Sequence, residues 1–106
     1  MSGGGNGPRT DGGPDIPCDM LRFETTVNSV DRKVLREVKV KDELDIALNV
    51  AEGVKRVLIM RNGDTLGSIT TQLAKILGCL EEGFEFVAVV LSKDGGACRV
   101  RVQPKA

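Results

Sequence analysis

The chain has 106 residues, which is the length of a single domain. Its 15 Lys and Arg residues balance its 15 Asp and Glu residues, so the whole molecule exerts no net attraction on nucleic acids or anionic lipids. Histidine, tyrosine and tryptophan are absent, which excludes Ser-His and Cys-His catalytic pairs and histidine-ligated metal ions.

The first 17 residues form a head rich in glycine and proline, in which Ile16 is the one large aliphatic side chain. Such a segment buries too little apolar surface to offset the entropy lost on ordering. We therefore predict a disordered tail over residues 1–17, a single domain over residues 18–103, and a short C-terminal tail over residues 104–106.

The N-terminus lacks the charged and apolar regions of a secretory signal, and no apolar run approaches the roughly 20 residues that span a bilayer. We therefore expect a cytoplasmic protein that has no membrane partner. In that compartment Cys18, Cys79 and Cys98 are expected to be reduced thiols, with Cys79 and Cys98 as small core residues. A disulfide or a redox switch is the alternative.

Alternating apolar and polar residues predict the strands of the first half. Residues 21–27 read as a half-buried strand, and residues 28–33 read as a polar loop. A second alternation runs from Val38 to Val50, but Asp42 would point into the core, which is costly for a carboxylate. A turn or bulge at residues 41–43 resolves this conflict and divides the segment into strands over 34–40 and 43–50.

Two hairpins and one helix are predicted for the second half. Asn62-Gly63 separates the apolar run 57–61 from residues 64–69, and this dipeptide is typical of a two-residue hairpin turn. A helix over residues 71–82, capped by Thr70 or Thr71 and ended by Gly83, has one apolar stripe, formed by Leu73, Ile76, Leu77 and Leu80. Residues 84–91 and 98–102 form the second hairpin.

These elements predict a mainly β fold, namely a small, partly open barrel or sandwich of about six strands. The single helix lies between the hairpins at 57–69 and 84–102.

Catalytic and cofactor motifs are absent from the sequence. It contains no C-x-x-C pair, no P-loop and no nucleophile elbow. Two acidic groups, Asp42-Glu43-Asp45 and Glu81-Glu82-Glu85, read as solvated turn and helix-end residues. We therefore predict that the protein is not an enzyme and needs no metal or other cofactor.

Basic residues form three groups along the chain. Arg32, Lys33 and Arg36 flank the first loop, Lys55, Arg56 and Arg61 flank the central strand, and Arg99 and Arg101 lie on one face of the last strand. The last pair fits either a binding role or the protective charges of an edge strand. Phe23 and Phe86 have inward-facing positions, which leaves few aromatic side chains for stacking on bases.

The stretch from Val57 to Val90 resembles part of a HIRAN domain. The shared features are an apolar strand, a Gly turn, Leu66-Gly67-Ser68-Ile69, a helix that begins with Leu73-Ala74, and Leu80-Glu81-Glu82-Gly83 before a further apolar strand. The resemblance implies a small β-barrel and, as in some members of that family, binding of the 3′ end of single-stranded DNA. Ser68 departs from the aromatic residue that is common after the Gly. The chain is also similar to small uncharacterised bacterial proteins with a Gly-rich head.

We therefore expect a non-enzymatic interaction module that acts through a protein partner. The alternative is HIRAN-like binding of single-stranded DNA or its 3′ end. The contact residues predicted for either role are Arg99, Arg101, Lys55, Arg56 and Arg61.

Overall fold

The computed structural model describes residues 16–106. Most of the predicted disordered tail lies outside these described residues. Ile16 packs against the hydrophobic core, and Pro17 precedes a short 3-10 helix, η2 (Cys18–Met20). The folded domain therefore includes Ile16, which lies ahead of the predicted domain boundary at Cys18.

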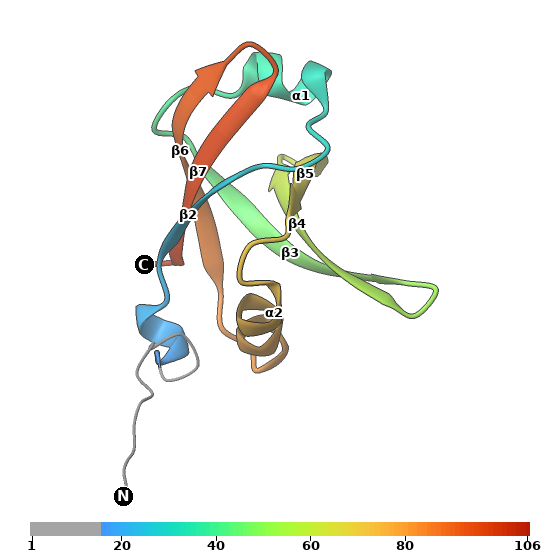
Figure 1. Ribbon diagram of the computed structural model, residues 1–106, viewed down its shortest axis with the longest axis vertical. Helices are drawn as coiled ribbons and strands as arrows, with labels where there is room; N and C mark the ends of the chain where they lie inside the picture. The colour runs from blue at the N-terminus through green and yellow to red at the C-terminus, as the bar shows by residue number, and fades with distance from the viewer. Residues whose placement is uncertain (1–15) are drawn as a thin grey trace, which may run out of the picture.

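Within residues 16–106, six strands form one antiparallel sheet in the spatial order β2-β7-β6-β3-β4-β5 (Figure 1). After η2 the elements are β2 (Phe23–Thr26), α1 (Arg32–Glu37), β3 (Glu43–Ala51), β4 (Val54–Arg61), β5 (Asp64–Ile69), α2 (Leu73–Glu81), β6 (Phe86–Asp94) and β7 (Ala97–Pro104). The predicted fold class is confirmed: the domain is mainly β, and its main helix, α2, lies between the β4–β5 and β6–β7 hairpins.

The sheet curls so that its two edges, β2 and β5, approach each other without forming a ladder. Beyond β2 the backbone N–H of Val27 still donates to Cys98 O of β7. One residue later, Asn28 and Ser68 of β5 exchange two backbone hydrogen bonds of 2.9 Å. A Cβ on Gly67 would lie 2.5 Å from Asn28 O, so only glycine permits this close approach of the two edges. The barrel is therefore partly open, with one bridge across the gap.

The predicted hairpin at Asn62-Gly63 is confirmed. Both residues have positive φ, 51° and 90°, and the turn joins β4 to β5. The β3–β4 turn has the same geometry, with φ of 53° at Glu52 and 79° at Gly53. The sequence predicted a strand that ends at residue 50, with no hairpin at Glu52-Gly53.

The predicted strand over residues 34–40 is wrong, because residues 32–37 form the helix α1. Asp31 caps this helix: its carboxylate accepts hydrogen bonds from the backbone N–H groups of Lys33 (2.9 Å) and Val34 (3.3 Å). The side chains of Leu35 and Val38 are buried. The predicted turn that follows is confirmed, since Asp42 Oδ2 accepts a 2.9 Å hydrogen bond from Lys39 N.

The predicted helix over residues 71–82 is confirmed as α2, and Gly83 ends it with a φ of 97°. Its predicted cap is wrong. Gln72 occupies the N-cap position without a side-chain capping bond. Instead, the hydroxyl of Thr70 accepts a 2.7 Å hydrogen bond from Asn28 Nδ2, and the hydroxyl of Thr71 shares a 2.7 Å hydrogen bond with Thr25 Oγ1. Both threonines therefore help to hold the β2 end of the chain beside β5.

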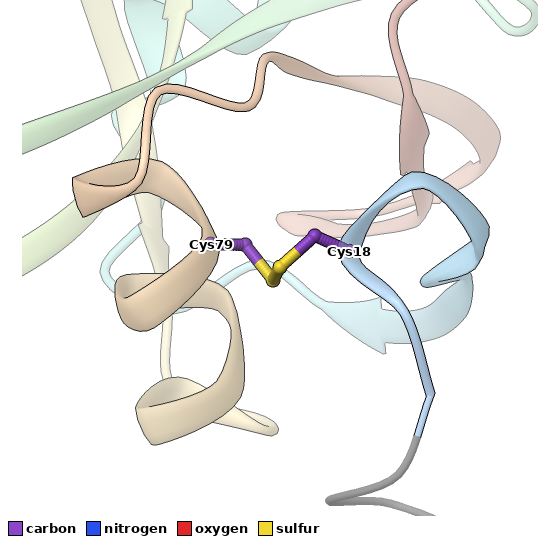
Figure 2. The surroundings of a disulfide bond; sticks show 2 residues. All are labelled: Cys18 and Cys79. Atoms are coloured by element: carbon purple, nitrogen blue, oxygen red, sulfur yellow. A yellow bond between two sulfur atoms is a disulfide. The ribbon is translucent and has the colours of Figure 1, made fainter.

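The expectation of three reduced thiols is wrong, because Cys18 and Cys79 form a disulfide. Figure 2 shows this bond joining η2 to α2, and 61 positions separate the two cysteines along the chain. A crosslink over a loop of this length stabilises a fold by about 4 kcal/mol in the chain-entropy description. Cys98 remains a free thiol and is buried, as expected.

The core lies between the curled sheet and the two helices. The largest fully buried side chains come from β4, β5, α2, β6 and β7 and from two positions outside the elements, Leu21 and Val38: Leu21, Val38, Val57, Ile59, Leu66, Ile69, Ile76, Cys79, Val90, Cys98, Val100 and Val102. Of the predicted aromatic core residues, Phe86 is buried and Phe23 is partly buried against the core. Neither helix of the described residues combines the length and apolar character needed to cross a membrane.

Candidate functional site

Arg99 and Arg101 lie on the outer face of β7, between buried residues that point inward. Arg99 forms an ion pair with Glu24 of β2 (3.6 Å) and donates a 3.1 Å hydrogen bond to Thr26 Oγ1. Arg101 donates a 2.8 Å hydrogen bond to Gln103 Oε1. Since β7 pairs with both β2 and β6, it is an interior strand. The interpretation of these arginines as charges that protect an edge strand from pairing is therefore wrong.

Lys55, Arg56 and Arg61 all belong to β4. Arg61 forms a 3.1 Å ion pair with Glu37 at the end of α1, and Lys55 forms an ion pair with Glu81 of α2. Arg56 is exposed and forms no ion pair with any residue in 16–106.

The five predicted contact residues therefore do not form one surface. Arg99 and Arg101 lie on β7, which is separated from β4 by two strands of the sheet. Glu24, Glu37 and Glu81 neutralise three of the five charges. The structure brings only Lys55 and Arg56 together beside a hollow.

That hollow has a volume of about 320 Å³. Besides Lys55 and Arg56 it is lined by Ser29 from the loop between β2 and α1, by Ser68 and Ile69 of β5, by Thr70, and by Leu73 of α2. We call it the hydroxyl hollow. Its mixture of cations and hydroxyls provides donors for an anionic ligand.

A second surface is the end of the β3–β4 hairpin, residues 49–56, which we call the β3–β4 arm. The arm projects from the rest of the molecule (Figure 1). β3 pairs with β6 only through Glu43–Asp45, and β4 pairs with β5 only from Val57 onward. Val50 and Val54 are 59% and 50% exposed on the arm. The arm therefore combines free backbone edges with exposed aliphatic side chains.

A third surface lies at the end of β6 that is farther from the β3–β4 arm, where α1 lies beside the β6–β7 turn. Arg32, Leu35 and Arg36 of α1, together with Lys93, Gly95 and Gly96, line a hollow of about 240 Å³. We call it the basic hollow. Lys93 Nζ also donates hydrogen bonds to Leu35 O (2.8 Å) and Val38 O (2.6 Å), which joins β6 to the end of α1.

The buried thiol of Cys98 is the one described group whose acidity departs clearly from its ordinary value. Burial raises the pKa of this thiol, because a thiolate loses hydration inside the core, and the nearby ammonium of Lys93 opposes the shift. A raised pKa keeps Cys98 protonated and makes it a poor nucleophile. The environment of Cys98 is that of a core residue.

The acidic groups take structural positions. Asp42 bonds to the turn that precedes β3, Glu81 pairs with Lys55, and Glu85 pairs with Lys105 over 3.9 Å. Within residues 16–106, no three His, Cys, Asp or Glu side chains are arranged to hold a metal ion.

Sequence reasoning missed two of the three surfaces. Arg32 and Arg36 were grouped as basic residues, but Lys93, Gly95 and Gly96 only connected the predicted strands 84–91 and 98–102, although this segment already contained a positive charge and two residues without side chains. The arm was missed because the alternation of residues 46–50 suggests a strand with one buried face. A signal for it was the short segment 51–53, which leaves room only for a tight hairpin.

Comparisons with protein-family models, curated proteins and solved structures found no match to this chain. The resemblance of residues 57–90 to a HIRAN domain stays a prediction.

Proposed function

We propose that this domain is a non-enzymatic interaction module that binds a protein partner through the β3–β4 arm. The observation that carries the proposal is the exposure of Val50 and Val54 at the end of a hairpin that has no strand neighbour on either outer edge within residues 16–106. Exposed aliphatic side chains on an unpaired edge are the features through which strands of two proteins associate.

The partner that fits the arm is an extended protein segment that carries both aliphatic and acidic side chains. Its backbone would hydrogen bond to a free edge of the arm, and its aliphatic side chains would cover Val50 or Val54. An acidic side chain would face Arg56, whose charge no described residue pairs. The ion pair between Lys55 and Glu81 ties the base of the arm to α2 and reduces the entropy lost on binding.

The absence of histidine and the structural positions of the acidic groups support a role without catalysis. The cytoplasmic location expected from the sequence stays a prediction, and the Cys18–Cys79 disulfide argues against it. Cytosolic thiols are kept reduced, whereas structural disulfides persist in oxidising compartments.

Affinity capture from the source cells with three matched baits tests this proposal. The baits are the unaltered chain, Val50→Asp/Val54→Asp, and the control Val40→Asp, in which a valine 50% exposed in the turn before β3 is changed. We expect a protein that the unaltered chain and the control both capture and the arm variant loses. A set of captured proteins that is identical for all three baits would overturn the arm as the binding surface.

Binding of single-stranded nucleic acid is the second candidate, and the hydroxyl hollow is the observation that favours it. Lys55 and Arg56, two of the predicted contact residues, line this hollow together with the Ser68 and Thr70 side chains. Cations provide the sequence-independent attraction to phosphates, and hydroxyls add hydrogen bonds.

Labelled oligonucleotides with free or blocked 3′ ends, titrated at low salt, test the second candidate. We expect saturable, salt-dependent binding that Arg56→Ala weakens and Arg99→Ala/Arg101→Ala leaves unchanged. The absence of saturable binding below roughly 100 μM would reject it, because nonspecific binding alone commonly reaches the micromolar range.

A further inference from the structure

We propose that the basic hollow between α1 and the β6–β7 turn binds a single phosphate group. This inference concerns the opposite end of β6 from the β3–β4 arm, and it does not depend on the function proposed for the arm.

Three like charges face this hollow without an acidic partner. The four ion pairs among residues 16–106 involve Lys55, Arg61, Arg99 and Lys105, and none involves Arg32, Arg36 or Lys93. The closest carboxylates in sequence belong to Asp31, Glu37 and Asp94, and none of them lines the hollow. Glu37 is paired with Arg61. Asp31 is occupied with the backbone N–H groups of Lys33 and Val34. The repulsion among the three cations is therefore not balanced by the described part of the chain.

Two of these cations have a stabilising contact or a favourable position in the fold, and the third has neither. Lys93 bonds to the carbonyls of Leu35 and Val38, and Arg36 lies in the last turn of α1, where a cation is favourable. Arg32 opens the same helix, where a cation is unfavourable, and it lies four residues before Arg36 on the same helix face. An anion held between the two guanidinium groups would remove both penalties.

The floor of the hollow suits a close approach by such an anion. A Cβ added to Gly96 would lie 3.4 Å from Arg32 Nη2, so the guanidinium lies directly beside a backbone without side chains. Gly95 and Gly96 form the turn between the two strands, and their backbone N–H groups donate none of the turn and loop hydrogen bonds among residues 16–106. Exposed N–H groups beside guanidinium groups are the donors that phosphate oxygens accept from.

The size of the hollow suits one phosphate group. Its volume of about 240 Å³ is smaller than the roughly 300–1,000 Å³ of pockets that enclose drug-sized ligands. The fork of an arginine matches two oxygens of a phosphate at once, which a lysine ammonium does not. Inorganic phosphate and a terminal phosphate on a larger molecule share this chemistry.

Titration of the ¹⁵N-labelled protein with inorganic phosphate, at ionic strength held constant with sodium chloride, tests the proposal by NMR. We expect saturable shifts of the Gly95 and Gly96 amide signals, with a Kd on the order of 1 mM. Arg32→Ala/Arg36→Ala should weaken binding by about tenfold or more. Lys33→Ala/Lys39→Ala is the matched control, since it removes the same charge from exposed neighbours, and it should bind as the unaltered protein does.

Two further measurements separate the remaining outcomes of this experiment. Arg32→Lys keeps the charge but loses the fork, and intermediate affinity would support recognition by the guanidinium even if the double variant were unfolded. Phenyl phosphate that binds more tightly than inorganic phosphate would assign the site to a terminal phosphate, and equal affinities would assign it to the free ion. The proposal is overturned if neither ligand gives saturable shifts, or if the lysine control loses as much affinity as the arginine variant.

Discussion

The β3–β4 and β6–β7 hairpins have turns of the same length but opposite surroundings. Each has two residues between its strands, Glu52-Gly53 in the first and Gly95-Gly96 in the second. The β6–β7 hairpin is flanked by β3 and β2, and Lys93 fastens its end to two carbonyls of α1. The end of the β3–β4 hairpin has no strand on either side within the described residues.

This difference shows that a two-residue turn forms in either setting, and that the neighbours of a hairpin decide which of its residues are exposed. The β6–β7 hairpin, which we call the held hairpin, brings Lys93 beside Arg32 and Arg36 around the basic hollow. The β3–β4 hairpin, which we call the free hairpin, leaves Val50 and Val54 exposed to solvent. Each end is therefore suited to a different kind of ligand, an anion at one and a protein segment at the other.

The largest loss of stability is expected where the chain is held covalently, at the disulfide between η2 and α2. Cys18→Ser/Cys79→Ser should lower the free energy of unfolding by about 4 kcal/mol, because the crosslink restricts the unfolded chain. Denaturant unfolding with and without dithiothreitol measures this loss. The reductant should affect the unaltered protein and not the variant. Equal midpoints for the oxidised protein and the variant would contradict a stabilising role.

A smaller loss is expected from releasing the held hairpin. Lys93→Met removes both hydrogen bonds to α1 and should lower the free energy of unfolding by about 2 kcal/mol. Hydrogen exchange should become faster over residues 32–38 and stay unchanged over residues 49–56. Lys39→Met, which removes an exposed lysine from the same end, should change neither quantity. If Lys93→Met changes stability and hydrogen exchange as little as Lys39→Met does, the contrast between the two hairpins is contradicted.

The pH dependence of stability is expected to report on the core beneath the held hairpin. The pKa of Cys98 lies above its ordinary value of 9.0 in the folded protein, because the thiol is buried. The resulting stabilisation is complete below the pKa of the unfolded chain. It is lost as the pH rises through the higher folded pKa, since the unfolded thiol ionises first. Unfolding measured between pH 7 and about pH 10 should show a smaller decline in Cys98→Ala. Identical declines would contradict this assignment.

The smallest effect is expected on the arm, and one strand contains both the test and its control. Val54→Ala should change the free energy of unfolding by no more than about 0.5 kcal/mol, because this side chain is exposed. Val57→Ala, three residues along β4, should cost about 2 kcal/mol, because Val57 is fully buried. Thermal or denaturant unfolding measures both changes. Similar losses at the two positions would mean that the arm is packed rather than free.

The elements that sequence reasoning located correctly depend on signals confined to a few neighbouring residues. Asn62-Gly63 accepts two positive φ angles at low cost, and this preference is sufficient to place a hairpin. The stripe from Leu73 to Leu80 and Gly83 likewise specify α2 and its end. The basic residues of β4 and β7 were predicted as contact residues, but their distribution over separate surfaces was not predicted.

The elements that it misassigned depend on contacts between distant segments. Val34, Leu35 and Val38 fit a short helix as well as a strand, and the bonds from the distant Lys93 favour α1 together with the local cap from Asp31. Thr70 and Thr71 are plausible caps by position, yet Asn28 and Thr25 engage their hydroxyls. Lys93 and Arg32 are 61 positions apart, so no local pattern could join them in one hollow.

The sequence by itself determined a small, mainly β domain, with its turns, its main helix and its lack of histidine, because each of these follows from composition or from local backbone preference. Tertiary structure alone decided that Cys18 reaches Cys79, that acids neutralise Lys55, Arg61 and Arg99, and that Arg32 meets the Gly95-Gly96 turn. These outcomes require side chains that lie far apart in the chain to meet. That meeting depends on the order of strands in the sheet, which local preferences do not specify.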